Sequence, residues 1–469
     1  MNRVGPPPME NNNPGMASRV EALNRRTRAA AVAIRDFERA LLGKLLEGNS
    51  LGKDLEPGAR KRLLAADAAG MSLENCARCG SCKARCPVYE ITKNEAFSPR
   101  GRLMLLKGLA EDSVPPTPGL LKRISACALC GQCDVSCPVG IRPTEFIYRG
   151  REALRKLDTG RLLLRTALRV GLRQPVFGLR AARFLGGLRH ESIKKVFPVD
   201  FSALIKNPGR RLGDEMAVIR PRKPTGRVAV FAGCTANYLM PETGESLIAM
   251  LVSMGYEVVM PRGEVCCGMP LKSLGLAREA ERFALKNLEL FGKLNVEAVI
   301  SPCPTCTDMI KNRYPEFAGD GIEKAVDSTM FFLKKLTGFF LKKTMGEENS
   351  GRREKEEHKE RLIWHEPCHL RYGLGFNADP LLKLLDVERP KDEGCCGLGA
   401  HLTDRQMSEE LLSRRVNAYN QSIKGAGGQA GRVVTACPGC RIQLERGGIK
   451  TAHILELIEE RFFVSPSGR

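Results

Sequence analysis

The sequence predicts a multidomain α/β protein, in which a helical, cysteine-rich N-terminal domain is followed by two copies of one α/β domain. With 469 residues, the chain is long enough for about three domains of ordinary size. Beyond residue 226, short β-rich runs alternate with helical stretches, as βαβ units require. The cysteines of this second half occur twice in the same order, which indicates an internal duplication.

The 18 cysteines point to bound metal in a reducing compartment. They fall in tight groups, and the opening segment MNRVGPPPMENNNPG lacks the apolar core of a secretory signal. The most apolar stretch, residues 331–343, is interrupted by lysines and is too short to cross a bilayer. We therefore expect a cytoplasmic protein, either free or peripheral on the cytoplasmic face of the membrane.

The positive charge lies almost entirely in the first half. Residues 1–226 hold 41 Lys and Arg against 21 Asp and Glu, whereas residues 227–469 hold 33 against 32. A basic region attracts an acidic subunit, an anionic lipid surface or nucleic acid, and charge alone does not choose among them. Within residues 151–226 an arginine recurs every fourth position, at Arg161, Arg165, Arg169 and Arg173. This helix either docks on an acidic surface or packs its leucines on the protein's own domains.

The chain divides into seven predicted segments. They are a disordered N-terminus (1–17), a helical N-terminal segment (18–70), a domain with two four-cysteine runs (71–150), a basic helical connector (151–226), a first cysteine repeat (227–342), a charged linker (343–360) and a second cysteine repeat (361–469).

The two four-cysteine runs have the spacing CxxCxxCxxxCP, which is typical of ferredoxin-type 4Fe-4S sites. A cubane cluster takes three thiolates from one compact loop, and the fourth comes from the other run. We therefore assign one cluster to Cys76, Cys79, Cys82 and Cys137, and the other to Cys127, Cys130, Cys133 and Cys86. Structural zinc is the alternative, although zinc sites usually pair one CxxC with a second, distant CxxC.

Each cysteine repeat offers five thiols. They are Cys234, Cys266, Cys267, Cys303 and Cys306 in the first repeat, and Cys368, Cys395, Cys396, Cys437 and Cys440 in the second. Tetrahedral zinc would leave one thiol unused in each repeat, whereas a cluster of several irons can use all five. A vicinal disulfide or a plain zinc site remains an alternative.

The motifs CTANY, EVCCG and SPCPTC, followed by HEPCHLRYG, EGCCG and CPGCRIQL, resemble the CCG (cysteine-rich) domains of heterodisulfide reductase and its relatives. Over about residues 70–465 the order of motifs resembles the iron-sulfur subunit of glycolate oxidase. Related subunits are those of lactate utilisation and anaerobic glycerol-3-phosphate dehydrogenase, and the heterodisulfide reductase D type. In the second repeat, 26 and 40 residues flank the Cys-Cys pair, a departure from the family pattern that the first repeat follows with 31 and 35.

The resemblance implies an α-helical ferredoxin domain with two 4Fe-4S clusters, and one or two further clusters, cubane or noncubane, in the CCG domains. It also implies an FAD-containing dehydrogenase partner that oxidises a glycolate- or lactate-type hydroxy acid, with electrons passing to a quinone or another carrier. The alternatives are a catalytic subunit of a heterodisulfide reductase-type complex and, least favoured, a zinc-containing nucleic-acid-binding protein. We expect no nucleic acid partner, because few aromatic residues accompany the charge.

No residue outside the cysteine motifs is assigned a catalytic role. His365 and His369, in HEPCH, could ligate metal or relay protons, but we interpret both as hydrogen-bonding residues behind the cysteines. The glycine-rich stretch 425–431 precedes a strand, so it lacks the context of a dinucleotide-binding loop. No flavin or nicotinamide site is visible, and we expect substrate oxidation to occur on the partner flavoprotein.

Overall fold

The computed structural model describes residues 55, 58–67, 70–173, 212, 217–318, 322–335, 360–424 and 431–463. All of them belong to one compact unit, Asp54–Arg469. The predicted disordered N-terminus, most of the 18–70 segment, residues 174–211 and 213–216 of the connector, the charged linker except Glu360, and nearly all of the glycine-rich stretch lie outside the described residues. In the described part of the chain, no helix is both long enough and apolar enough to span a membrane.

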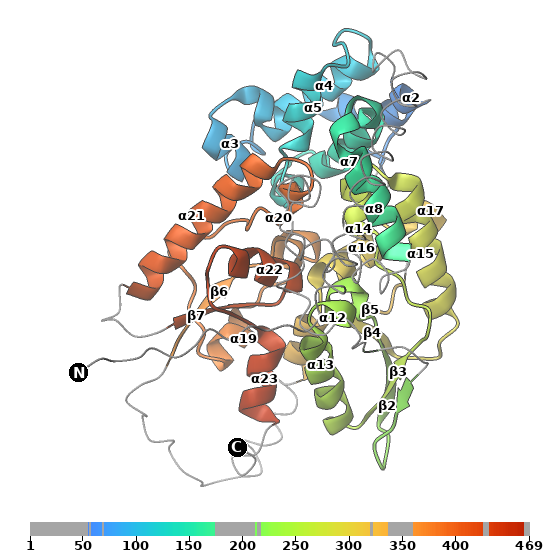
Figure 1. The fold of residues 1–469 in the computed structure, drawn as a ribbon, viewed down its shortest axis with the longest axis vertical. Coiled ribbons are helices and arrows are strands. Elements are labelled where there is room, and N and C mark those ends of the chain that lie inside the picture. Colours follow the sequence, from blue (N-terminus) through green and yellow to red (C-terminus); the bar gives the residue numbers. More distant parts are fainter. Residues whose placement is uncertain are drawn as a thin grey trace, which may run out of the picture. The chain divides into compact units, whose positions relative to one another are not determined.

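The domain with the two four-cysteine runs is helical, as predicted (Figure 1). Its helices begin at favourable residues: Ser98 and Thr117 each cap a helix with a side-chain oxygen, and proline occupies the first turn of several. The elements are α2 (Ala59–Leu64), η1 (Leu73–Asn75), α3 (Pro87–Thr92), η2 (Glu95–Phe97), α4 (Pro99–Ala110), α5 (Pro118–Ser125), α6 (Gln132–Val135) and α7 (Pro143–Ala153).

The connector continues as η3 (Arg155–Leu157), η4 (Thr159–Arg161) and α8 (Leu162–Arg173). Its arginines do not form a free stripe. Arg161 and Arg165 both pair with Asp158, at 2.6 and 2.9 Å, and Arg169 pairs with Glu279 at 2.7 Å. Because three of the four arginines are bound within the protein, the structure favours the interpretation in which this helix packs on the protein's own domains.

The first repeat is built on a five-stranded sheet of order β1-β3-β2-β4-β5, in which only the β1–β3 pair is antiparallel. The central strands are buried β-branched runs, as predicted from the sequence. The strands are β1 (Ala217–Ile219), β2 (Gly226–Val230), β3 (Tyr256–Met260), β4 (Ala298–Ser301) and β5 (Ala325–Asp327). The helices are α12 (Gly233–Tyr238), α13 (Pro241–Ser253), α14 (Met269–Ser273), α15 (Ala277–Gly292), α16 (Pro304–Asn312) and α17 (Pro315–Ala318).

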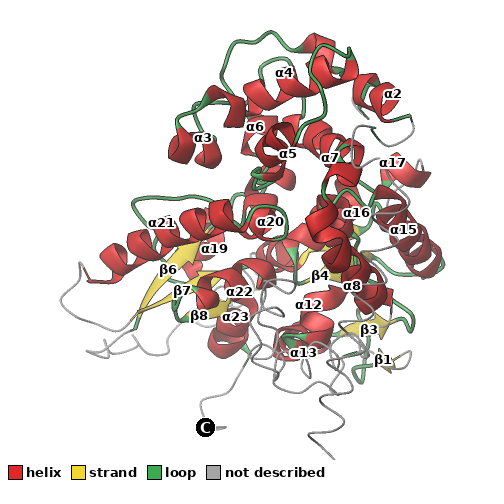
Figure 2. Cartoon of the chain, turned by 45° about the horizontal axis from the view of Figure 1, so that its top comes forward, coloured by secondary structure: helices red, strands yellow, loops and turns green. Residues whose placement is uncertain are grey.

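The second repeat has a smaller parallel sheet of order β6-β7-β8 (Figure 2). Its strands are β6 (Arg361–His365), β7 (Gly431–Thr435) and β8 (Thr451–His453). Its helices are η5, a π-type turn (His369–Gly373), α19 (Asp379–Leu384), α20 (Leu398–His401), α21 (Arg405–Lys424), α22 (Pro438–Arg446) and α23 (Ile454–Phe462). A single bridge between Ile363 and Glu388 stands where β3 pairs with β2 in the first repeat.

The two repeats contact each other and the helical domain. Helix α13 packs on α23, and α12 packs on α22. The helical domain contacts the first repeat through α7 on α14, and the second through α3 on α21 (Figure 1). The helical domain therefore adjoins both repeats, which places its cysteines within reach of theirs.

Candidate metal centres

The structure brings together the first crossed set of thiols, which we call site 1. Cys76, Cys79, Cys82 and Cys137 line one hollow together with Arg100 and Leu103. Cys79 is exposed, so site 1 lies at the surface of the helical domain. The three thiols of the first run thus meet the last thiol of the second run, in agreement with the predicted grouping.

The complementary set, site 2, lies deeper. Cys86, Cys127 and Cys133 are buried, and Cys86 and Cys127 lie close enough to act electrostatically on Cys130 and Cys133. Cys86 also caps α3 by accepting from the amide of Tyr89 at 3.5 Å. The first run therefore supplies a thiol to site 2 from a helix start, while its other three cysteines turn away to site 1.

The two runs share left-handed backbone positions, shifted by 51 residues. Gly80 and Gly131 have φ of 86° and 75°, and Arg78 and Leu129 have φ of 56° and 55°. A left-handed residue two positions after the first cysteine is costly for a side chain, so these turns are held by the surrounding structure. The matching dihedral angles indicate that both runs wrap the same kind of object.

Two arginines of the segment SPRGR adjoin the ferredoxin-type sites, a role that sequence reasoning missed. Arg100 donates to the carbonyl of Arg78 at 2.9 Å and acts electrostatically on the thiols of site 1. Arg102 is buried, donates to the carbonyl of Arg123 at 2.7 Å and acts on Cys86 of site 2. The sequence held a signal for this role: Arg100 and Arg102 are two residues apart in one helix turn, so their side chains point to different neighbours.

The five thiols of the second repeat form site 3. Cys368 lies just before η5, Cys395 and Cys396 come before α20, and Cys437 and Cys440 occupy the start of α22. The Sγ atoms of Cys396 and Cys440 are 3.5 Å apart, and Cys368 is a hydrogen-bond partner of Cys395. All five are buried, so the structure gathers the complete predicted set.

The five thiols of the first repeat form site 4 with the same layout. Cys234 lies in α12, Cys266 and Cys267 come before α14, and Cys303 and Cys306 occupy the start of α16. The Sγ atoms of Cys234 and Cys266 are 3.6 Å apart. Gly233 has φ of 67°, and a Cβ there would lie 3.0 Å from the sulfur of Cys306. Glycine at this position therefore leaves room for the sulfur group.

The four sites follow one another along the molecule: the first run supplies cysteines to both site 1 and site 2, and sites 2, 3 and 4 adjoin in that order. Cys130 of site 2 acts electrostatically on Cys395 and is acted on by Cys368, both of site 3. A Cβ on Gly399 would fall 2.0 Å from the carbonyl of Ala128, so the second repeat approaches the second run at backbone contact. The next step is a hydrogen bond between Cys437 of site 3 and Cys303 of site 4.

His369 stands at the junction of sites 3 and 4. Its Nδ1 lies 3.2 Å from the hydroxyl of Thr305, whose Oγ1 is also 3.7 Å from the sulfur of Cys437. Its Nε2 lies 3.9 Å from a carboxylate oxygen of Asp308. His369 therefore bridges the two repeats through hydrogen-bonding groups behind the cysteines, consistent with its interpretation from the sequence.

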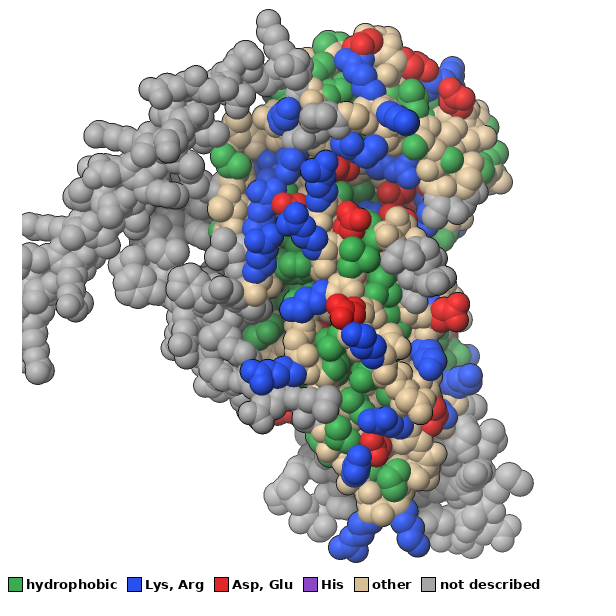
Figure 3. Space-filling view, turned by 90° about the vertical axis from the view of Figure 1, so that its right-hand side faces the viewer, with side chains coloured by type: hydrophobic (Ala, Val, Ile, Leu, Met, Phe, Trp, Pro, Cys, Tyr) green, Lys and Arg blue, Asp and Glu red, His purple; other side chains and the backbone are tan. Residues whose placement is uncertain are grey.

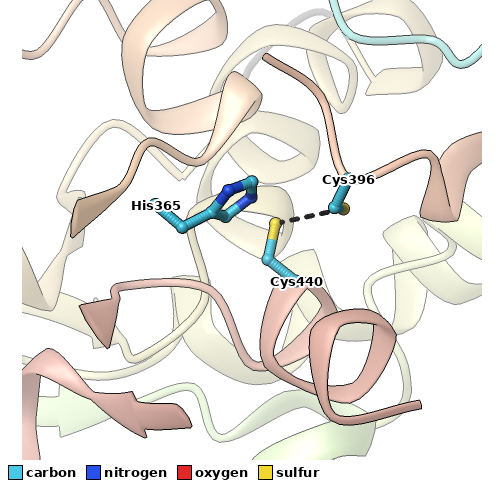
Figure 4. A group of neighbouring side chains, drawn as sticks. All are labelled: His365, Cys396 and Cys440. Carbon is cyan, nitrogen blue, oxygen red and sulfur yellow. Dashed lines mark hydrogen bonds between the residues drawn. The ribbon is translucent and has the colours of Figure 1, made fainter. Parts of the chain in front are cut away.

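His365 ends strand β6 and faces site 3 (Figure 4). Its Nδ1 lies 2.6 Å from the hydroxyl of Tyr419, and its Nε2 is buried with no hydrogen-bond partner among the described residues. A ring nitrogen of His365 and the sulfurs of Cys396 and Cys440 all lie within 4.8 Å of one another. Burial lowers the pKa of His365 to about 4, so the ring is neutral at physiological pH.

The raised pKa values of the buried thiols of site 2 are compatible with bound iron ions. Burial raises the pKa of Cys86, Cys130 and Cys133 above that of a free thiol, so the apoprotein holds these groups protonated. Bound iron reverses this preference, because a metal ion deprotonates a coordinating thiol. The unpartnered Nε2 of His365 beside the thiols is a second sign that a polar group completes site 3.

A separate, arginine-rich hollow opens on the face formed by α2, α8 and α15, where Lys and Arg side chains gather (Figure 3). The charged residues that line it are Arg62, Arg155, Arg169, Arg278 and Arg282, with Glu152 and Glu279. Arginines outnumber carboxylates there, so the hollow favours an anionic group. It is distinct from the arginine stripe predicted on α8, of which only Arg169 takes part.

Comparison with known proteins agrees with this arrangement. The 4Fe-4S dicluster domain matches residues 72–141, and the CCG cysteine-rich domain matches twice, at residues 228–311 and 362–445. The probable glycolate oxidase iron-sulfur subunit of Bacillus subtilis (strain 168) is 26% identical over 438 residues, covering 83% of this chain and 94% of the relative. The glycolate oxidase iron-sulfur subunit of Escherichia coli (strain K12) is 28% identical over 412 residues, covering 83% and 94%.

A third relative has a different role in its name. One of the subunits of the fumarate reductase (CoM/CoB) of Methanothermobacter marburgensis is 25% identical over 419 residues, covering 82% of this chain and 72% of the relative. The matched domains support iron-sulfur clusters, in preference to structural zinc, as the cofactors. The chain therefore contains one 4Fe-4S dicluster domain and two CCG cysteine-rich domains, and over most of its length it is similar to iron-sulfur subunits of glycolate oxidase.

Proposed function

We propose that this chain is the iron-sulfur electron-transfer subunit of a flavin-dependent hydroxy-acid dehydrogenase complex. The single observation that carries the proposal is the series of four cysteine sites. The first run spans site 1, with exposed Cys79, and site 2, and site 2 adjoins the paired sites 3 and 4. One-electron carriers must lie close to one another, and a series of adjoining sites meets that requirement.

Sites 1 and 2 each hold one 4Fe-4S cluster in this proposal, on the crossed ligand sets. Sites 3 and 4 each hold a further cluster on five thiolates, cubane or noncubane. Iron-sulfur clusters supply reversible one-electron redox chemistry, with potentials from about −700 to +450 mV that depend on charge, hydrogen bonds and solvent exposure. The chain's own residues set those conditions. Arg100 and Arg102 place positive charge beside sites 1 and 2, and the cysteines of sites 3 and 4 are buried apart from half-buried Cys234.

The partner in this proposal is an FAD-containing dehydrogenase for glycolate or lactate, and the acceptor is a quinone or another carrier. Two relatives named glycolate oxidase iron-sulfur subunits support this choice. The arginine-rich hollow is the surface that we assign to an acidic partner, because its guanidinium groups lie on the same face of the molecule. A peripheral position on the cytoplasmic face of the membrane fits the quinone acceptor.

The test is to isolate the tagged full-length chain anaerobically from its own host and to identify what accompanies it. We expect a flavoprotein, and we expect glycolate or lactate to reduce the dye dichlorophenolindophenol in the isolated complex. In a Cys127→Ser variant the substrate should still bleach the flavin, while reduction of sites 3 and 4 should fail. Absence of any flavoprotein, or reduction of sites 3 and 4 without site 2, would contradict the proposal.

A second candidate function is the reduction of a disulfide at the junction of sites 3 and 4. The observation that favours it is the pairing of the two sites through Cys303 and Cys437, with His369 and Thr305 beside them. Cleavage of a disulfide consumes two electrons and two protons, and paired one-electron centres supply the electrons. Oxidation of reduced methyl viologen that depends on an added disulfide would establish this activity, and a rate equal to the disulfide-free background would exclude it for the compound tested.

A further inference from the structure

The two repeats differ at one pair of positions beside their cysteine sites. Phe231 of the first repeat stands where His365 stands in the second, three residues before Cys234 and Cys368 respectively. Phe231 packs on Phe291 with ring centroids 5.4 Å apart, and His365 packs on Tyr419 at 6.0 Å. One repeat thus has an apolar aromatic pair at a position where the other has a hydrogen-bonded polar pair.

The hydrogen bond between Tyr419 and His365 indicates that the Nε2 atom of His365 carries a proton. The hydroxyl of Tyr419 is buried, and in the described part of the chain its hydrogen-bond partner is the Nδ1 of His365, at 2.6 Å. If Tyr419 donates to Nδ1, then the neutral ring carries its proton on Nε2. The opposite tautomer would leave the buried hydroxyl proton of Tyr419 without an acceptor, which costs free energy.

The Nε2 atom then has one direction in which to donate. It is buried and unpartnered, and the sulfurs of Cys396 and Cys440 are the polar atoms grouped with the ring (Figure 4). The other two buried histidines of this repeat have different partners: His453 contacts the carbonyl of Ala436 at 2.9 Å, and His401 contacts the hydroxyl of Ser408 at 3.4 Å. Among these three histidines, the geometry singles out His365.

We propose that the Nε2–H of His365, oriented by Tyr419, donates a hydrogen bond to a cluster-bound sulfur of site 3, and that this bond raises the reduction potential of site 3 above that of site 4. A donor stabilises the more negative, reduced form of a cluster, so hydrogen bonds to sulfur raise its potential. Site 4 has no such donor at this position, because Phe231 replaces the histidine. The inference rests on the proposed binding of a cluster at site 3.

As a consequence, sites 3 and 4 differ in reduction potential although their cysteines have the same arrangement. Electrons that arrive from site 2 would reside on site 3 in preference to site 4. His365 is a positioning residue in this account, since it acts on the thiolates of Cys396 and Cys440 and touches no substrate.

The test is an EPR-monitored redox titration of the full-length, anaerobically purified protein without its partner. The key variant is the double substitution His365→Phe and Tyr419→Phe, which copies the aromatic pair of the first repeat and leaves no hydroxyl unpaired. We expect the potential of site 3 to fall, and the potentials of the other sites to stay unchanged. His365→Gln, which keeps an N–H donor, should recover part of the loss, and His401→Gln is the matched control.

The reciprocal variant, Phe231→His with Phe291→Tyr, should raise the potential of site 4. An unchanged potential of site 3 in the double phenylalanine variant would overturn the proposal. Loss of the site 3 cluster in both His365 variants, with site 4 intact, would show that His365 is an iron ligand and would also overturn it. A parent protein without any cluster at site 3 would refute the inference, yet electron transfer through sites 1 and 2 would still be measurable, so the two failures are distinguishable.

Discussion

The first and second repeats hold their cysteines in the same geometry but surround them with different chemistry. In both, a strand leads to a first cysteine, a Cys-Cys pair precedes a short helix, and a CxxC pair opens another helix. The loop before the pair is anchored by buried Asn287 in the first repeat, which donates to the carbonyl of Val265 at 3.1 Å. In the second it is anchored by Arg415, which pairs with Asp392 at 2.7 Å.

The backbone that positions the cysteines and the polar residues around them therefore vary independently between the two repeats. The scaffold fixes where five sulfurs lie, and it tolerates a sheet of five strands or of three. The surroundings, such as Phe231 against His365, determine what the bound group experiences. A change to the scaffold or to the surroundings of one repeat, with the other repeat as the control, can therefore separate the two contributions.

Removal of a thiol should give the largest effect. Cys396→Ser should abolish the cluster of site 3 and spare site 4, whereas Cys267→Ser should do the reverse, with a loss of about four iron atoms per chain in each case. Iron and acid-labile sulfide measured on anaerobically purified protein check this. Loss of both clusters from either substitution would mean that the two repeats share one cluster.

Substitution of Cys137 tests the crossed assignment of the ferredoxin-type sites and should likewise remove one cluster. Cys137→Ala should damage the cluster of site 1 and leave site 2 intact, because Cys137 lines the hollow of Cys76, Cys79 and Cys82. EPR spectra of the reduced variant report which signal disappears. Loss of the signal of site 2 instead would show that each run binds its own cluster.

The two repeats attach to the helical domain by different chemistry, which predicts a difference in stability. Glu145 of α7 is buried and pairs with Arg313 at 2.8 Å and with Lys272 at 3.4 Å in the first repeat. In the second repeat, Thr403 donates to the carbonyl of Ser125 at 2.8 Å. Glu145→Gln should cost up to about 3–5 kcal/mol, since it removes one of the two carboxylates, Glu145 and Glu316, that balance the buried cations Lys272 and Arg313. Thr403→Val should cost only about 0.5–1.5 kcal/mol.

The contribution of Glu145 should also depend on pH. Burial alone would raise its pKa, but the adjacent Lys272 and Arg313 outweigh burial and lower it to about 2. A carboxyl with a depressed folded-state pKa stabilises the protein above its ordinary pKa and loses that contribution as the pH falls from about 4.5 towards 2. Urea unfolding midpoints at several pH values check both predictions. A Glu145→Gln protein as stable as the parent at pH 7 would show that the ion cluster does not hold the two parts together.

The arginine-rich hollow should give the smallest effect, because exposed charges are screened. Arg278→Gln and Arg282→Gln should each weaken binding of an acidic partner by about 0.2–1 kcal/mol at low salt, and by less at high salt. Arg405→Gln, at the start of the corresponding helix α21, is the control in the second repeat. Partner binding that is unchanged in the α15 variants, or equally weakened in the control, would remove the hollow from the interface.

Sequence reasoning predicted the layers of this molecule that depend on local patterns. Beyond residue 226 strands alternate with helices, as the β-rich runs predicted, and the grouping of Cys137 with the first run followed from the chemistry of a cubane. The segment boundaries and the ligand assignments remain predictions.

Contacts between distant residues could not be predicted in this way. The arginine stripe on α8 left two interpretations open, docking and packing on the protein's own domains. The structure favours packing, because Asp158 and Glu279 pair with its arginines, and the sequence alone does not reveal those partners. The contact between His365 and Tyr419 joins positions 54 residues apart, and a single sequence holds no sign of that pairing. Polar contacts of this kind distinguish the two repeats. The sequence alone therefore predicted the cysteine arrangement that the repeats share, but not the polar contacts in which they differ.

The measurement that tests the central claim most directly is EPR of the fully reduced, anaerobically purified full-length chain. If four clusters lie in a contact series, the protein should hold on the order of 16 iron atoms at four per cluster, and the signals of neighbouring sites should broaden one another. The signal of site 2 should then sharpen in a Cys368→Ser variant, which removes its neighbour at site 3. A colourless protein that contains zinc, or four signals that do not change when a neighbouring site is removed, would contradict the account.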